Sequence, residues 1–80
     1  MDKFNISNVY YELGKLGYKK YSVSTGKDKN EIIVAIRLDK KLNKITFNKI
    51  GRNYKYSVKG DEHSRVISQL IFDLLMYFMR

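Results

Sequence analysis

Asp61, Glu62 and His63 form a run of titratable residues in which acid–base or metal chemistry would be sought. Zinc sites and catalytic centres need several ligands or partners, and this chain contains a single histidine and no cysteine. Three polar residues where a helix is expected to begin are more simply explained as its cap. The other carboxylates of the predicted loops are scattered, so no pair of carboxylates suited to acid–base work is indicated. We therefore predict a non-enzymatic protein without catalytic residues, metal or cofactor.

A second short motif, Gly14-Lys15-Leu16-Gly17, has the Gly-x-x-Gly form with which KH domains clamp a nucleic-acid backbone. In those domains the loop joins two helices, whereas here a strand-like segment follows. Gly17 is equally explained as the residue that ends a helix, because glycine readily adopts the left-handed conformation needed there. No phosphate-binding loop of the P-loop or dinucleotide type occurs.

Positive charge is concentrated in the middle of the chain. The net charge is +8, from 16 Lys and Arg against 8 Asp and Glu. Between Lys15 and Gly60, 13 Lys and Arg face 3 Asp and Glu, whereas the flanking segments are slightly negative. Such a field attracts polyanions, including nucleic-acid phosphates, an acidic protein surface or anionic lipid. The alternative is that lysine only solubilises edge strands and turns.

If the charge is functional, an anionic partner binds the cations of the predicted strands and turns. The candidate contacts are Lys19, Lys20, Lys27, Lys29, Arg37, Lys40, Lys41, Lys44, Arg52 and Lys55.

The tyrosines are interleaved with lysines, as in Tyr18-Lys19-Lys20-Tyr21 and Tyr54-Lys55-Tyr56. Aromatic rings beside cations favour stacking on single-stranded nucleic acid. However, strand alternation groups these tyrosines with the apolar positions, which favours core or rim places for the rings and outward-pointing lysines.

The periodicity predicts two helices and three or four strands. Helical spacing runs over 6–16, and a second apolar helical pattern follows Gly60-Asp61 to the C-terminus. Strand patterns cover 18–24, 31–38 and 44–50, with a fourth, amphipathic strand at 54–59. Asp39 to Asn43 is predicted as the turn before the third strand. Hairpin connections imply an antiparallel sheet, so we predict an α+β single domain over residues 1–80, of order α-β-β-β-(β)-α, with both helices on one face.

Local signals define the ends of the helices and the faces of the sheet. Asn5 is a suitable N-cap, and Phe4 and Val9 occupy the positions of a hydrophobic staple. Asp61 is expected to cap the last helix, with Glu62 in its first turn, where the helix dipole favours a carboxylate. The apolar arc of that helix is predicted to be Val66, Ile67, Leu70, Ile71, Leu74, Leu75 and Phe78. The opposite, open face of the sheet is predicted to carry Lys20, Ser22, Ser24, Ile33, Ala35, Arg37, Thr46, Asn48, Lys55, Ser57 and Lys59.

The last helix has more apolar residues than its main arc can bury. Phe72, Met76 and Met79 fall on another side of it. Exposed clusters of this composition are typical of interfaces, so these residues are candidates for a homodimer or protein-partner contact. The alternative is that they pack on the first helix or that the end of the last helix simply frays.

Composition also indicates the setting of the protein. The absence of cysteine is compatible with a reducing cytosol, and Met1-Asp2-Lys3-Phe4-Asn5 lacks the features of a secretory signal. The apolar run near the C-terminus contains Asp73 and is too short to span a bilayer. We expect a protein of the bacterial cytoplasm, and its wealth of Lys, Asn and Ile is what an AT-rich genome, bacterial or phage, encodes.

Two families resemble parts of this pattern. The helix–strands–helix order is similar to that of double-stranded RNA-binding domains, although the last helix opens with Asp61-Glu62-His63-Ser64 where that family has a basic cluster. The first half resembles small phage anti-CRISPR proteins of α-β-β-β-α form. The residues that carry this likeness are Asn5-Ile6, Glu12-Leu13, Gly17-Tyr18 and Ile32-Ile33 through Ile36-Arg37-Leu38.

The second resemblance implies a compact phage accessory protein that inhibits host machinery by binding. Those relatives act as acidic mimics of DNA, so a basic chain would have to use a different surface. We therefore expect a phage or mobile-element protein that binds nucleic acid or a protein partner. The alternative is a homodimeric interaction protein, or a DNA-binding regulator, that uses the apolar C-terminal helix.

Overall fold

The chain folds into two helices and four strands in a computed structural model that describes residues 2–80. The elements are α1 (Ile6–Lys15), β1 (Tyr21–Thr25), β2 (Glu31–Leu38), β3 (Lys41–Ile50), β4 (Asn53–Lys59) and α2 (Arg65–Met79).

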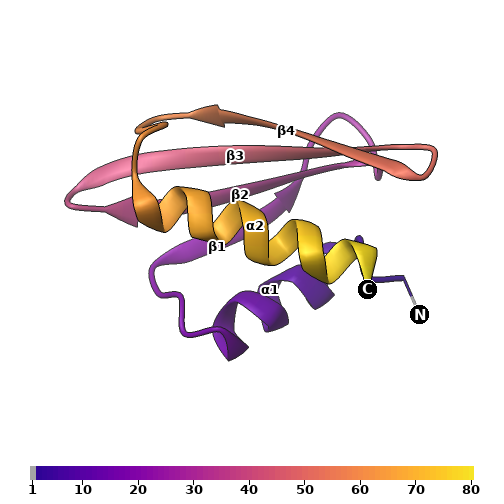
Figure 1. The fold of residues 1–80 in the computed structure, drawn as a ribbon, viewed down its shortest axis with the longest axis horizontal. Helices are drawn as coiled ribbons and strands as arrows, with labels where there is room; N and C mark the ends of the chain where they lie inside the picture. The colour runs from indigo at the N-terminus through magenta and orange to yellow at the C-terminus, as the bar shows by residue number, and fades with distance from the viewer. Residues whose placement is uncertain (1) are drawn as a thin grey trace.

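The four strands form one antiparallel sheet in the order β1-β2-β3-β4, so each strand pairs with the next one along the chain. Both helices lie on the same side of this sheet, next to each other (Figure 1). The predicted α+β fold is confirmed, including the fourth strand. Because the sheet is open, β1 and β4 each have a free edge.

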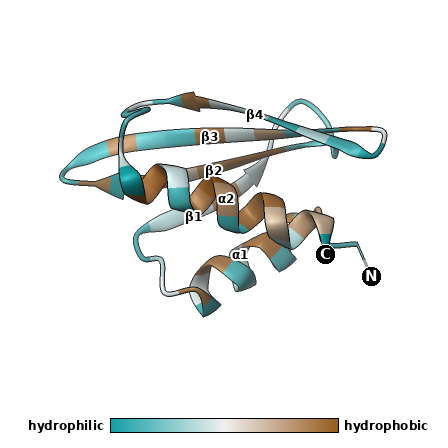
Figure 2. Cartoon of the chain, in the orientation of Figure 1, coloured by the Kyte–Doolittle hydropathy of each residue, from teal (hydrophilic) through white to brown (hydrophobic). Residues whose placement is uncertain are grey.

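The core lies between the helices and the inner face of the sheet. In the central strands, Val34 lies opposite Ile45 and Ile32 lies opposite Phe47, and all four are at most 1% exposed. Successive residues of a strand point to opposite faces, so these side chains form one apolar floor. Hydrophobic residues are frequent along α2, whereas the β2–β3 turn is hydrophilic (Figure 2). The buried hydrophobic residues of the helices are Val9 and Leu13 of α1 and Ile67, Leu70, Ile71, Leu74 and Phe78 of α2.

The N-terminus of α1 agrees with its sequence signals. The Asn5 side chain accepts the backbone N–H of Asn8 at 2.8 Å, as an N-cap does. Phe4 is 4% exposed and Val9 is fully buried, so both residues of the predicted staple belong to the core. Gly17, with φ of 94°, follows the helix in the left-handed conformation expected of it.

The predicted start of α2 is wrong. Ser64 is the N-cap, and its Oγ accepts the N–H of Ile67 at 3.3 Å. Glu62 therefore precedes the helix, whose first turn contains no acidic residue. Asp61 closes a turn instead, because its carboxylate accepts the N–H of His63 at 3.1 Å. Serine and aspartate cap helices about equally well, and the later of the two residues is the one used.

The apolar arc of α2 is narrower than predicted. Val66, in the first turn of α2, is 43% exposed. Leu75 is half-buried against the core.

The two central strands meet in a tighter turn than predicted. Leu38 pairs with Lys41 across Asp39 and Lys40 alone. Both turn residues have positive φ, 48° and 67°, the pattern of a type I′ turn. The five-residue turn is therefore wrong, and β3 begins at Lys41. The sequence conceals this turn because it lacks the Asn-Gly or Asp-Gly pair that normally marks one.

The first strand begins at Tyr21, three residues later than predicted. The N–H of Tyr18 bonds to the carbonyl of Leu13 at 3.0 Å, which holds Tyr18 against the C-terminal end of α1. Lys20 has φ of 57°, outside the strand region. Tyr18 is thereby free to reach α2 instead of pairing in the sheet.

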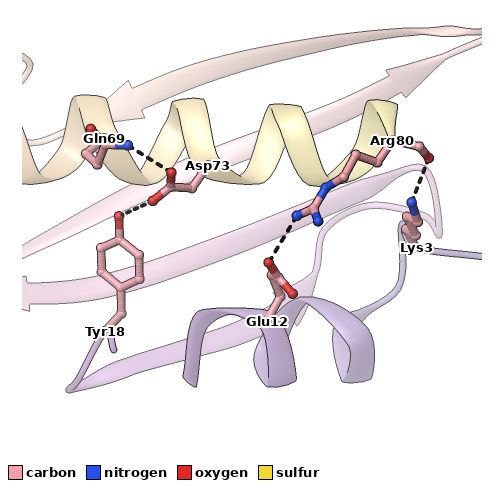
Figure 3. A network of polar contacts seen from close by, with 6 residues as sticks. All are labelled: Lys3, Glu12, Tyr18, Gln69, Asp73 and Arg80. Atoms are coloured by element: carbon pink, nitrogen blue, oxygen red, sulfur yellow. Dashed lines mark hydrogen bonds and ion pairs between the residues drawn. The ribbon is translucent and has the colours of Figure 1, made fainter. Parts of the chain in front are cut away.

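Polar contacts join the two helices on their shared side (Figure 3). The Tyr18 hydroxyl donates to Asp73 at 2.8 Å, and Arg80 forms an ion pair with Glu12 at 3.4 Å. Burial raises the pKa of Tyr18, and the hydrogen bond to Asp73 and the charge of that carboxylate raise it further. Asp73 of α2 therefore faces the α1–β1 connection, and Arg80, which follows α2, reaches Glu12 of α1.

Candidate functional site

Within residues 2–80, no element covers the face of the sheet opposite the helices (Figure 1). The register brings the outward-pointing residues of four strands together on this open face. They are Ser22, Ser24, Glu31, Ile33, Ala35, Arg37, Leu42, Lys44, Thr46, Asn48, Lys55, Ser57 and Lys59. The alternation predicted ten of them but not Glu31, Leu42 or Lys44, and Lys20, which was predicted for this face, precedes β1 with φ of 57°.

Three exposed cations form a band across one end of this face. Lys44 of β3 lies directly opposite Lys59 of β4, and Arg37 of β2 is the diagonal neighbour of Lys44, because its own partner is Leu42. Directly opposed and diagonal neighbours lie within about 8 Å of each other. We call Arg37, Lys44 and Lys59 the basic band. Lys20 extends it past β2, since its carbonyl accepts the N–H of Arg37 at 3.1 Å.

No member of the basic band forms an ion pair within residues 2–80. The one ion pair in that part of the chain, Glu12 with Arg80, lies in the helix layer. The open-face carboxylate Glu31 stands at the other end of β2 and accepts the N–H of Lys27 at 3.2 Å. Like charges that face each other across strands destabilise a sheet by a few tenths to about 1 kcal/mol. A bound anion would remove that repulsion between Lys44 and Lys59.

The ten predicted contacts fall into two groups. Lys19, Lys20, Arg37, Lys40, Lys41 and Lys44 lie at the end of the sheet that holds the β2–β3 turn. In contrast, Lys27, Lys29, Arg52 and Lys55 lie toward the opposite end, on or near the other two strand connections.

The alternation places Lys59 on the open face, although the predicted contacts do not include it. The two-residue connection of Gly51 and Arg52 sets the register that brings Lys59 opposite Lys44. A two-residue turn at Gly51 and Arg52 is the signal that predicts Lys59 opposite Lys44 from the sequence.

The tyrosines of the strands lie on the inner side of the sheet, as the alternation predicted. Tyr21 and Tyr54 pack against the core, and Tyr56 is 52% exposed at its rim. The Tyr21 hydroxyl donates to the carbonyl of Tyr10 at 3.0 Å. The open face as described has no aromatic side chain on which a base could stack.

The other sequence motifs have structural roles here. His63 is exposed in the turn before α2, where its N–H bonds to Asp61. Gly17 ends α1, and a strand follows it instead of the second helix of a KH loop.

A second surface lies along the free edge of β4. A groove between this strand and α2 is lined by Tyr56, Ser57, Val58, Glu62, Ser68, Ile71, Phe72 and Leu75. Phe72, Met76 and Met79 are 59%, 46% and 62% exposed, so the alternative that they pack on α1 is wrong.

Comparison with family models finds no match to this chain, and no curated protein or solved structure matches it either. Neither helix within residues 2–80 is long and apolar enough to cross a membrane.

Proposed function

We propose that this protein is a non-enzymatic binding protein that holds the phosphate backbone of a nucleic acid on the basic band. The observation that carries the proposal is the placement of Lys44 directly opposite Lys59, with Arg37 diagonal to the pair and no ion-pair partner for any of them within residues 2–80. Two like charges in register weaken the free protein, and an anion between them turns the same charges into an attraction.

The chemistry of the open face favours contact with the backbone over reading of bases. Small side chains such as Ser22, Ala35 and Thr46 leave the face shallow beside the band. Base recognition by single-strand binders depends on aromatic platforms, and here the tyrosines lie on the inner side. We therefore expect binding that depends little on sequence and strongly on salt.

The biological role we propose is that of a phage or mobile-element accessory protein, of the anti-CRISPR type, that modulates host machinery. The support is the resemblance of the first half of the chain to small phage proteins of this kind, together with the small, cysteine-free composition. Because the chain is basic, we expect it to bind the nucleic-acid component of that host machinery, in the bacterial cytoplasm.

A capture experiment from bacterial lysate, with and without nuclease, tests this function. Capture by the wild-type protein that is lost after nuclease treatment supports it, as does loss of capture in Lys44→Glu/Lys59→Glu. The matched control, Lys27→Glu/Lys29→Glu, changes the same charge at the other end of the sheet and should retain capture. Capture of an acidic protein that survives nuclease and still requires the basic band would replace the nucleic acid with that protein.

A second candidate function is that of an interaction protein working through α2. The exposure of Phe72, Met76 and Met79 favours it. It does not compete for the open face, because these residues lie on the helix side of the sheet.

A further inference from the structure

The two free edges of the sheet differ in how they are covered. β1 has five residues, and α1 lies along it. The Tyr10 and Tyr21 rings are 5.0 Å apart, and the Tyr21 hydroxyl donates to the Tyr10 carbonyl. β4 has seven residues and borders the groove that Tyr56 and Phe72 line. A long uncovered edge presents unpaired backbone groups that readily pair with another strand.

The hydrogen-bond pattern shows which residues of β4 have unpaired backbone groups. Lys49 of β3 donates its N–H to Asn30 on the β2 side, at 2.8 Å. Backbone direction alternates along a strand, so the odd-numbered residues of β3 bond toward β2 and the even-numbered ones toward β4. The β4 partners of the latter are Lys55, Ser57 and Lys59. The N–H and C=O groups of Tyr54, Tyr56 and Val58 therefore point to the free edge.

We propose that a second copy of this chain occupies this edge, with the two β4 strands antiparallel about a two-fold axis at Tyr56. This register pairs Tyr56 with the partner's Tyr56 and Tyr54 with the partner's Val58, so all three outward-bonding residues are used. Tyr56 is also the midpoint of Asn53–Lys59, and the full strand is paired. The result is a continuous eight-stranded sheet.

The charges of β4 select this register over its neighbours. A shift to a two-fold axis at Lys55 sets that lysine opposite itself, and a shift to an axis at Ser57 sets Lys55 opposite the partner's Lys59. With the axis at Tyr56, Lys55 faces a serine and Lys59 faces Asn53. Because like charges opposite each other are unfavourable, the central register is preferred.

The helix side of the sheet supports the same arrangement. Phe72 lines the groove together with Tyr56, so an axis at Tyr56 brings two copies of Phe72 toward each other. Met76, one turn further along α2, is 46% exposed and continues this apolar side. The dimer buries side chains that a monomer leaves in water.

The dimer and the proposed nucleic-acid binding respond to salt in opposite directions. Two chains of +8 repel each other, so added salt strengthens self-association, whereas it weakens contacts to phosphates. Loss of one property therefore leaves the other open to measurement.

Single-cysteine variants test the register directly, because the chain has no cysteine of its own. Directly paired residues have Cα atoms about 5.5 Å apart, which suits a disulfide. Under mild oxidation Tyr56→Cys should form a disulfide dimer, while Tyr54→Cys and Val58→Cys alone should not. Those two variants should crosslink when mixed. Equal crosslinking of all three single variants, or none in Tyr56→Cys, would overturn the register.

Sedimentation velocity at high micromolar concentration tests the dimer without cysteines. Wild type should sediment as a dimer, and Tyr56→Lys, which sets two lysines opposite each other, as a monomer. Tyr11→Lys is the matched control, since Tyr11 is 72% exposed on α1. A wild type that stays monomeric, or a dimer that survives Tyr56→Lys but is lost in Phe72→Glu, would overturn strand pairing.

Discussion

Lys44 and Lys59 face each other across the β3–β4 ladder, each exposed and neither in an ion pair within residues 2–80. Lys44→Glu converts this repulsion into an attraction, so the free energy of unfolding should rise by about 0.2–1 kcal/mol. The affinity for nucleic acid should fall in the same variant. Urea denaturation checks the first effect, with Lys55→Glu as the control, because Lys55 lies opposite the neutral Asn48 and its reversal should leave stability nearly unchanged. A less stable Lys44→Glu would contradict the opposed geometry.

Gly60 lies where the chain leaves β4 and passes close to a buried amide. Its φ is 146°, and a Cβ there would overlap the Asn43 side chain. Asn43 is 2% exposed, and its Oδ1 accepts the N–H of Asp61 at 2.8 Å. Gly60→Ala should lower the free energy of unfolding by about 2–4 kcal/mol, from backbone strain and the disturbed hydrogen bond.

Gly17→Ala is the control for this effect, measured by the same urea denaturation. Gly17 also has positive φ, 94°, but a Cβ there would meet no atom within 4 Å. Gly17→Ala should therefore lower the free energy of unfolding by only about 1–2 kcal/mol, the strain of a left-handed residue. Equal losses in the two variants would show that the contact with Asn43 has no effect.

Tyr18 makes stability depend on pH above neutrality. Burial and then Asp73 raise its pKa above the ordinary value of 10. The native state therefore keeps a proton that the unfolded chain loses, so this contribution is complete below pH 10 and declines as the pH rises further. Tyr18→Phe should lose roughly 1–2 kcal/mol at neutral pH and show a shallower decline above about pH 10. The control Tyr11→Phe should show the same decline of the free energy of unfolding with pH as wild type, measured by denaturation across this range. If Tyr18→Phe also declined as steeply as wild type, Tyr18 would be excluded as the cause.

The Glu12–Arg80 pair ties the end of α2 to α1. The Glu12 side chain is 9% exposed and that of Arg80 62%, so Arg80→Gln leaves a nearly buried carboxylate without its partner. A loss of about 1 kcal/mol is expected, less than for a fully buried pair because water screens the arginine. A double-mutant cycle with Glu12→Gln should show coupling between the two residues. Simple additivity of the single effects would mean that the pair does not contribute.

Much of the fold could be predicted from local patterns. The alternation of Ile32, Val34 and Ile36 and the helical spacing of Leu70, Ile71 and Leu74 determine which face each element buries, and all are buried as expected. These signals are reliable because burial of a whole face outweighs any single local preference.

Element ends were harder to predict. The Asp39-Lys40 turn contains no residue type that favours positive φ strongly, and its geometry follows from the pairing of the strands on either side. The start of α2 depended on a choice between two residues, Asp61 and Ser64, of similar capping strength. The basic band depends on the β2–β3 and β3–β4 registers, which local patterns do not determine, so the cations can be found from the sequence but not which of them lie opposite each other.

The salt dependence of nucleic-acid binding tests the proposed role of the basic band most directly. The slope of log affinity against log salt is about −0.9 for each phosphate contacted, so three cations contribute roughly −3. Replacing Arg37, Lys44 and Lys59 with glutamine should remove that part of the slope, whereas replacing Lys15, Lys27 and Lys29 should not. An affinity that does not change with salt, or an equal change of slope in both triple variants, would contradict binding at the basic band.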